Sequence, residues 1–214
     1  MNERELKLPM DDETVRSLKV GDAVSLHGVI VTGRDAVHKW MAETFIRKTR
    51  QPEGDDIQAH EAVRPLLNGG AIYHCGPVVA RDARGFRFVA AGPTTSMREE
   101  PYEAEVMWHF NIKAVIGKGG MGVKTLEACR AVPAVYLHVV GGAASLLAQS
   151  VAEVLGAYKT EFGVPETMWV ARVESFPAVV TMDAHGKSLH AQVEAASKAR
   201  LRQLLSCNAP EASF

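Results

Sequence analysis

Residues 92–122, GPTTSMREEPYEAEVMWHFNIKAVIGKGGMG, contain two glycine-rich loops, each after a short apolar run and before a helical pattern. The first loop is Gly92-Pro-Thr-Thr-Ser-Met-Arg98 and the second is Gly117-Lys-Gly-Gly-Met-Gly122. Glycine lets the backbone approach a ligand closely, and the free N–H groups at a helix start can bind an anion. Because one loop carries an arginine and the other a lysine, the sequence predicts a site for a small dianion.

Strand and helix patterns alternate around these loops. Apolar runs rich in β-branched residues predict strands at residues 23–32, 71–75, 78–80, 86–91, 114–116, 134–140, 168–173 and 178–182. Helical spacing of apolar residues predicts helices over residues 36–48, 98–110, 123–131, 141–151 and 189–205. The early strands have an antiparallel character, whereas the alternation in the middle favours parallel pairing. The prediction is therefore an α/β fold, a mixed sheet with flanking helices.

We expect one compact domain over residues 21–206, because 214 residues can bury a sizeable core and the chain contains no internal repeat. Residues 1–20 are polar and charged, which predicts an arm ahead of the fold, and residues 207–214 are expected to form a tail. The polar stretch at residues 49–62 contains proline and glycine, which predicts a surface loop or insertion.

Composition excludes some classes of partner. The formal net charge of -1 gives no general attraction to nucleic acid or to a membrane, so any preference for anions must be local. No apolar stretch approaches the ~20 residues that span a bilayer, and the N-terminus lacks the apolar region of a signal peptide. Cys75, Cys129 and Cys207 are widely spaced, which argues for buried or incidental thiols in a reducing compartment. We therefore expect a cytoplasmic protein whose own residues hold no metal.

The first loop offers Thr94, Thr95, Ser96 and Arg98. One interpretation is a helix cap, with Ser96 or Thr95 bonding the first turn. However, an arginine near a helix start opposes the macrodipole, and such a locally unfavourable choice is more common where the residue serves a ligand. We favour a binding role for this loop, with one hydroxyl capping.

The second loop is neither of the common nucleotide-binding motifs. Its lysine comes too early for a Walker A loop, and no acidic residue follows at the distance that a dinucleotide site requires. Gly117 and Gly119 on either side of Lys118 still indicate a backbone held close to a ligand. The alternative is a tight turn with Lys118 in solvent.

A third candidate is the corner formed by Arg34 and Asp35 after the first long strand, with His38 beside it. Ligand sites in α/β folds gather at such strand ends. The alternative is that Asp35 caps the next helix and pairs with Arg34 on the surface. With three cationic corners, the sequence favours a clamp in which arginines grip carboxylates bidentately and the lysine acts as a point charge.

Taken together, these stretches resemble the class I (iron–sulfur) fumarate hydratase and L-tartrate dehydratase family, specifically its C-terminal domain or separate β subunit. The resemblance runs from about Gly21 to Leu189, and its matching motifs are Thr32-Gly-Arg-Asp-Ala-Val-His-Lys39, Gly76-Pro-Val-Val79, both glycine loops, Gly141-Gly-Ala-Ala144, Pro165-Glu166, Trp169, Phe176-Pro177 and Asp183-Ala-His-Gly-Lys-Ser-Leu189. It implies a swivelling β/β/α domain. It also implies reversible addition of water to a four-carbon dicarboxylate, with a [4Fe-4S] cluster held by three cysteines of the other domain or α subunit.

The resemblance also implies roles for single residues. Arg34, Arg98 and Lys118 would bind substrate carboxylates, and Thr94 would take the C3 proton with help from an aspartate of the partner. The supporting residues that we expect around them are Asp35, His38, Thr95, Ser96, Gly117 and Gly119.

We thus expect the β subunit of a heteromeric hydro-lyase, acting on fumarate and malate first and on L-tartrate second, inactive without its α subunit. A homodimer of such subunits is compatible with this expectation. The rival interpretations are a non-catalytic module that binds a small dianion, such as a dicarboxylate or phosphate, and a nucleotide-binding protein that uses the second loop.

Overall fold

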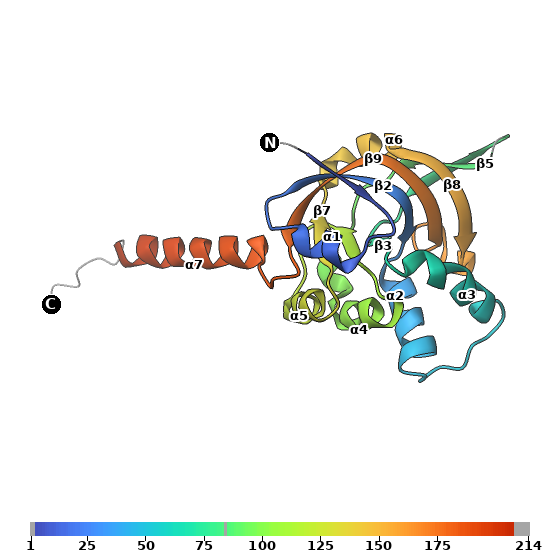
Figure 1. The fold of residues 1–214 in the computed structure, drawn as a ribbon, viewed down its shortest axis with the longest axis horizontal. Coiled ribbons are helices and arrows are strands. Elements are labelled where there is room, and N and C mark those ends of the chain that lie inside the picture. Colours follow the sequence, from blue (N-terminus) through green and yellow to red (C-terminus); the bar gives the residue numbers. More distant parts are fainter. Residues whose placement is uncertain (1–2, 84, 208–214) are drawn as a thin grey trace.

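The computed structural model describes residues 3–83 and 85–207, and it contains one seven-stranded mixed sheet and a two-stranded hairpin (Figure 1). The sheet order is β1-β2-β3-β6-β7-β9-β8, and the hairpin is β4-β5. The strands are β1 (Arg4–Lys7), β2 (Ala23–Thr32), β3 (Ala71–Tyr73), β4 (Val78–Asp82), β5 (Gly85–Ala90), β6 (Ala114–Gly117), β7 (Val135–His138), β8 (Val151–Tyr158) and β9 (Met168–Met182). The α-helices are α1 (Asp12–Ser17), α2 (Asp35–Met41), α3 (Asp56–Leu67), α4 (Glu100–Phe110), α5 (Val123–Ala131), α6 (Ala144–Gln149) and α7 (Leu189–Cys207). The predicted α/β fold with a mixed sheet and flanking helices is confirmed.

The sheet closes on itself. Strands β2, β3, β6 and β7 are parallel, and the antiparallel strand β9 pairs with β7 at one end of this series and with β2 at the other. These five strands therefore form a ring, and β1 and β8 are added outside it. The parallel pairing expected for the middle of the chain is confirmed. Among the pairings of the early strands with one another, β1-β2 and β2-β3 are also parallel, and β4-β5 is antiparallel.

Two apolar cores lie on opposite faces of the ring. The inner core contains fully buried residues such as Leu26, Tyr73 and Phe176. The outer core lies between the strands and helices α2 to α5, and includes Trp40 and Met107. Alternate residues of a strand point to opposite faces, so strands buried on both faces are apolar throughout, as in Ala114–Ile116 of β6.

The expected arm over residues 1–20 is wrong for most of its length. Strand β1 pairs in parallel with β2, and Leu6, Val15 and Leu18 are buried in the inner core. The apolar residues in this segment are too widely spaced to stand out among the charges, and only the tertiary contacts give them a common face.

Three other boundaries differ from the sequence-based expectation. The loop expected at residues 49–62 ends at Asp56, where α3 begins. Strand β8 was not predicted, because none of its residues is fully buried and its pattern is interrupted by Gly156. The two strands expected at 168–173 and 178–182 are one continuous strand, β9, which passes through Pro177 beside Ser25.

The C-terminal helix leaves the body of the protein. In Figure 1 helix α7 extends away from the sheet and its flanking helices. Of the tail expected at 207–214, Cys207 ends α7 and residues 208–214 lie outside the described residues. Among the described residues, no helix has both the length and the apolar character needed to cross a bilayer.

Candidate functional site

The two glycine loops are joined to each other and to the end of β3 by backbone contacts. The Thr94 amide donates to the His74 carbonyl at 2.7 Å, and the Ser96 amide donates to the Lys118 carbonyl at 3.2 Å. Thr95 and Lys118 also form a parallel β-bridge. Because β2, β3 and β6 are parallel, their carboxyl ends meet at one edge of the ring, where open α/β sheets place ligand sites. The structure thus brings Thr94, Lys118 and the β3 end together.

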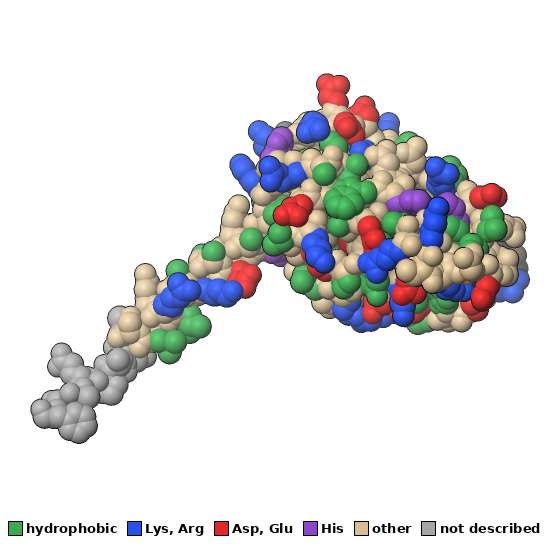
Figure 2. Space-filling view, turned by 90° about the horizontal axis from the view of Figure 1, so that it is seen from below, with side chains coloured by type: hydrophobic (Ala, Val, Ile, Leu, Met, Phe, Trp, Pro, Cys, Tyr) green, Lys and Arg blue, Asp and Glu red, His purple; other side chains and the backbone are tan. Residues whose placement is uncertain are grey.

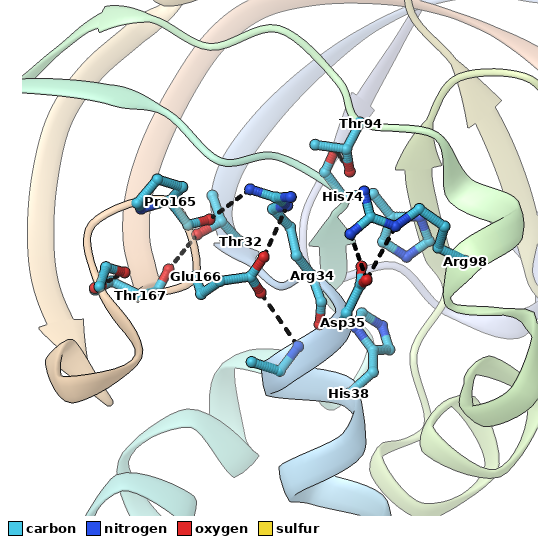
Figure 3. Close-up of polar contacts among 12 residues, drawn as sticks. Thr32, Arg34, Asp35, His38, His74, Thr94, Arg98, Pro165, Glu166 and Thr167 are labelled. Carbon is cyan, nitrogen blue, oxygen red and sulfur yellow. Dashed lines mark hydrogen bonds and ion pairs between the residues drawn. The ribbon is translucent and has the colours of Figure 1, made fainter.

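Arg34 enters this edge from the end of β2. Its Nε lies 3.2 Å from Glu166 Oε1, and its Nη1 donates to the Pro165 carbonyl at 3.4 Å (Figure 3). A Cβ on Gly76 would lie 2.7 Å from Arg34 Nη1, so the absence of a side chain there makes room for the guanidinium. Arg34 is therefore held between two loops that are far apart in sequence.

Arg98 pairs with Asp35 across the site (Figure 3). Arg98 Nε donates to Asp35 Oδ2 at 2.9 Å, and Nη2 of the same guanidinium contacts the same oxygen. Burial acts to raise the pKa of Asp35, but hydrogen bonds from Arg98 and Glu99 together with the charge of Arg98 outweigh it and lower that pKa below its ordinary value. The surface pairing of Asp35 with Arg34, which the sequence left open, is not what the structure shows.

Lys118 is the third cation. Among the described residues it forms no ion pair. Its stem lies beside the backbone at Gly141, where a Cβ would be 3.2 Å from Lys118 Cδ. Two cations of the site thus have acidic partners in the chain itself, and Lys118 has none among the residues described.

The helix starts next to the site are already occupied. Glu100 accepts from the Gly122 amide at 2.8 Å, the Lys124 amide at 3.0 Å and the Thr125 hydroxyl at 2.6 Å, and so caps α5. Glu166 Oε2 accepts from the Ala36 amide at 3.2 Å, in the first turn of α2. The N–H groups at the start of α5, which the sequence offered to an anion, are therefore capped by a carboxylate of the chain itself.

A buried hydrogen-bond network supports the site from below. His74 Nδ1 lies 2.9 Å from Ser96 Oγ, which lies 2.8 Å from the Tyr136 hydroxyl. On its other side, His74 Nε2 lies 2.8 Å from Glu103 Oε2, and the same oxygen is 3.0 Å from His38 Nε2. Ser96 and His38 therefore lie beneath the site, where they position its loops, and neither capping by Ser96 nor direct exposure of His38 to a ligand is observed.

The surroundings of His38, Glu103 and His74 shift the pKa of each of these side chains. His38 Nδ1 lies 2.9 Å from the Arg34 carbonyl oxygen, and His38 Nε2 lies 3.0 Å from Glu103 Oε2. Burial lowers the pKa of His38, but the Glu103 carboxylate outweighs it and raises that pKa. Burial similarly raises the pKa of Glu103, but His38 and His74 outweigh it and lower that pKa to about 2. For His74, burial dominates and lowers the pKa, so it is neutral.

Glu99 completes the buried network. It is fully buried, and both its carboxyl oxygens and Asp35 Oδ1 lack a donor among the described residues when both groups are ionised. A proton on Glu99 supplies that donor and hydrogen bonds the two carboxyls. Burial, together with Asp35, raises the pKa of Glu99 to about 8 against the opposing effect of His38.

The glycines of the second loop have different functions. An added Cβ on Gly117 would lie 1.9 Å from Ser96 Oγ and 2.9 Å from the Tyr136 hydroxyl, so this glycine lets the network pass directly under the loop. Gly119 has φ +82°, a backbone conformation that other residues rarely adopt, although no atom lies within 4 Å of the position of an added Cβ. Thr95 is exposed at the rim of the site.

The described cysteines do not fit an iron–sulfur cluster. Cys75 belongs to the inner core and Cys129 to the outer core, so the sheet separates them. Burial raises the pKa of Cys75 to about 12 and that of Cys129 further, which keeps both as thiols. The described residues that converge with metal-ligand spacing are His38, His74 and Glu103, whose facing atoms are already paired with one another.

Several residues of the site were not predicted from the sequence. From the sequence, no role at the site was assigned to His74, Glu99, Glu100, Glu103 or Glu166. Their spacing resembles that of an ordinary polar helix face or loop. Glu166 stood in a matching motif, but its two roles, toward Arg34 and toward α2, depend on a contact across 130 residues.

Comparison with known proteins identifies the family. A family model described as fumarase C-terminus matches residues 2–193 of the chain. The chain belongs to this family.

Its relatives within the fumarase C-terminus family include one much longer protein and two proteins named as beta subunits. A putative fumarate hydratase class I of Geobacillus stearothermophilus is 48% identical over 200 residues, which are 92% of this chain but 35% of that protein. The L(+)-tartrate dehydratase subunit beta of Escherichia coli is 38% identical over 188 residues, covering 87% of this chain and 86% of that subunit. A putative L(+)-tartrate dehydratase subunit beta of Methanocaldococcus jannaschii is 37% identical over 193 residues. The chain thus spans about a third of the first relative and most of the two subunits.

Proposed function

We propose that this chain is the β component of a hydro-lyase that reversibly hydrates a four-carbon dicarboxylate, fumarate to malate first and L-tartrate as the second candidate. The observation that carries the proposal is the convergence of Arg34, Arg98 and Lys118 around the loop of Thr94. The names of the relatives support the same reaction class. The relative lengths support a separate α-type partner, which would hold the [4Fe-4S] cluster that the described cysteines do not fit.

The three cations are proposed to bind the substrate carboxylates. Arg98 uses Nε and Nη2 for Asp35, which leaves Nη1 for a ligand, and Arg34 is held by Glu166 with its guanidinium toward the same edge. Lys118 would supply the charge that no described acid neutralises. A dianion placed here would be bound by fixed, oriented donors, which are worth more than mobile ones.

Thr94 is proposed to take the proton from C3 of the substrate. Its hydroxyl donates to the His74 carbonyl at 3.2 Å, so its lone pairs remain available as acceptors. The C3–H electrons would become the double bond as the hydroxyl leaves C2, and nearby cations would stabilise the negative charge that develops on the carboxylate. A threonine hydroxyl can take this proton only if it gives up its own, so the role requires that the aspartate of the partner accept the hydroxyl proton as the C3 proton is transferred, in a site from which the partner surface excludes water.

The test is to purify the chain with its presumed α partner without oxygen and to assay fumarate, malate and L-tartrate. We expect Lys118→Ala and Arg98→Ala each to lower kcat/KM by about 100-fold or more, because each removes a charged contact to a bound carboxylate. Lys124→Ala, which removes an exposed lysine of α5, is the matched control and should leave kcat/KM unchanged.

Full activity in either loop variant would refute the carboxylate clamp. Binding of a dicarboxylate or phosphate by the chain alone, with no turnover in the presence of any partner, would instead favour a non-catalytic binding module.

A further inference from the structure

Two carboxyl groups meet beneath the Arg98 corner of the site. Glu99 is fully buried directly before α4, and Asp35 is the first residue of α2. Both carboxyl oxygens of Glu99 and Oδ1 of Asp35 are buried, and without a proton between them they have no hydrogen-bond partner among the described residues. Because two ionised carboxylates in contact repel each other, a shared proton is what allows this arrangement.

The shared proton belongs to Glu99. Asp35 Oδ2 accepts from Arg98 Nε at 2.9 Å and also contacts Nη2 of the same guanidinium, which favours the ionised form of Asp35. Glu99 has no cation within hydrogen-bond distance in the described part of the chain, and burial, together with Asp35, raises its pKa to about 8. Glu99 is therefore mostly neutral at pH 7 and loses its proton as the pH rises toward 9.

The other titratable groups described close to Glu99 are His38 of α2, Glu103 of α4 and Tyr136 of β7. Glu103 is ionised near neutral pH, because the histidines beside it outweigh the effect of burial and lower its pKa to about 2. Burial raises the pKa of Tyr136, so its hydroxyl stays protonated. The Glu103 carboxylate raises the pKa of His38 against the effect of burial, so His38 can also release a proton as the pH rises. A Glu99 variant is therefore needed to separate the two protons.

Arg98 connects the carboxyl pair to the ligand site. Its Nε and Nη2 are used by Asp35, and Nη1 has no partner among the described residues (Figure 3). The position of Arg98 thus depends on Asp35, and the position of Asp35 depends on the donor at its Oδ1. Ionised Glu99 would place a second carboxylate against that oxygen, which would displace Asp35 and with it the guanidinium.

The charge of Glu99 also matters for the ligand directly. In the view of Figure 2, acidic and basic side chains are interspersed over the surface, and the formal net charge is -1, so the charge of the site depends on local groups. Arg34 and Arg98 each have an acidic partner in the chain, whereas Lys118 has none among the residues described. An ionised Glu99 would offset this one uncompensated cation, and the site would lose its net positive charge for a dianion.

We propose that Glu99 is a positioning residue, whose proton holds Asp35 and Arg98 in place for a dicarboxylate, so that ligand affinity falls when Glu99 ionises. This inference rests on the proposed function, because it takes Arg98 as a ligand to a substrate carboxylate.

Calorimetric binding of succinate tests the inference without turnover, because this four-carbon dicarboxylate has neither a double bond nor a hydroxyl group. In the full chain with its α-type partner, we expect the affinity for succinate to fall about 10-fold from pH 7 to pH 9, as one group with a pKa of about 8 ionises. Glu99→Gln keeps a donor toward Asp35 but does not titrate, so its affinity should match the original protein at pH 7 and change at most ~2-fold up to pH 9. Glu127→Gln, which removes an exposed carboxylate of α5, is the matched control and should keep the original pH profile.

Proton uptake gives a second measurement. Calorimetry at pH 8.5 in two buffers of different ionisation enthalpy should show that the original protein takes up more than about half a proton per succinate bound, and that Glu99→Gln takes up markedly less. Equal pH profiles of the original protein and Glu99→Gln would overturn the proposal, as would equal proton uptake. Failure of the proposed reaction would look different: succinate would bind with the expected pH profile, but fumarate, malate and L-tartrate would not be converted.

Discussion

The Glu99 carboxyl group shows how one residue departs from its ordinary chemistry. It is fully buried and its pKa is raised to about 8, so it carries a proton at neutral pH and donates it toward Asp35. Asp35 in turn holds Arg98, whose guanidinium faces the site. Beneath the site, the Glu103 carboxylate lies 3.0 Å from His38 Nε2 and raises the pKa of that ring. A proton on Glu99 avoids a further negative charge there.

Glu99→Gln tests this protonation through stability. The folded pKa of about 8 lies above the ordinary value of 4.5, so unfolding releases a proton between these limits and becomes easier as the pH rises. Glutamine keeps a donor toward Asp35 but does not titrate. We expect the Tm of the variant to rise relative to the Tm of the original protein between pH 5 and pH 8. At pH 8 the variant should have the higher Tm, by on the order of 5 °C.

His38 and His74, whose pKa shifts are in opposite directions, also make the Tm depend on pH. Because both proteins contain these histidines, their contributions cancel in the difference in Tm at each pH. A constant difference in Tm across the series would mean that Glu99 is ionised in the folded protein.

At the scale of elements, the two glycine loops act as one unit. Gly117 lies directly over Ser96, and Ser96 joins His74 to Tyr136, so β3, β6, β7 and the first loop meet at one hydroxyl group. Carboxylates from other elements cap α2 and α5. The loops that carry Arg34, Thr94 and Lys118 are therefore positioned by this buried support.

Gly117→Ala should destabilise the protein by about 1–3 kcal/mol, because the new Cβ would lie 1.9 Å from Ser96 Oγ. Ser96→Ala removes that oxygen, so the double variant should recover part of the loss. Gly142→Ala is the matched control, since no atom lies within 4 Å of its Cβ position and its φ is negative or extended. Denaturant unfolding measures all four proteins, and equal stability of the two glycine variants would contradict the close contact.

At the scale of the whole molecule, the ring depends on segments from both ends of the chain. Strand β1 adds to β2, and β9 closes the ring between β7 and β2. Leu6, Val15 and Leu18 fill the inner core from a segment whose composition is that of a polar arm.

Deletion of residues 1–18 should therefore lower the free energy of unfolding by an amount comparable to the total stability of the domain. The reason is that removing even one large buried apolar side chain typically costs about 2–5 kcal/mol. Truncation after Val193 removes only exposed helix from the described part of the chain and serves as the control, with little change in the Tm of the body. Thermal unfolding of the two truncated proteins distinguishes an integrated segment from an arm: equal Tm values would favour the arm.

The local sequence determined the features that depend on neighbouring residues. Helix α5 begins and ends where its pattern predicts, at Val123 and Ala131, and the glycine loops lie at strand ends as expected. The motifs around Arg34, Thr94, Arg98 and Lys118 were sufficient to predict the family. The hydrophobic period, the residues that favour turns and the spacing of motifs are properties of consecutive residues. They can therefore be recognised in the sequence alone.

Only the tertiary structure decided which charges meet. Asp35 binds Arg98 instead of its neighbour Arg34, Glu166 holds Arg34 from 132 positions away, and Glu100 fills the helix start that otherwise would attract an anion. The tertiary structure likewise decided that β9 closes the ring and that Leu6, Met10, Val15 and Leu18 are buried. Pairing energies and pKa shifts depend on distance and burial in space, and neither quantity is contained in the spacing of residues along the chain.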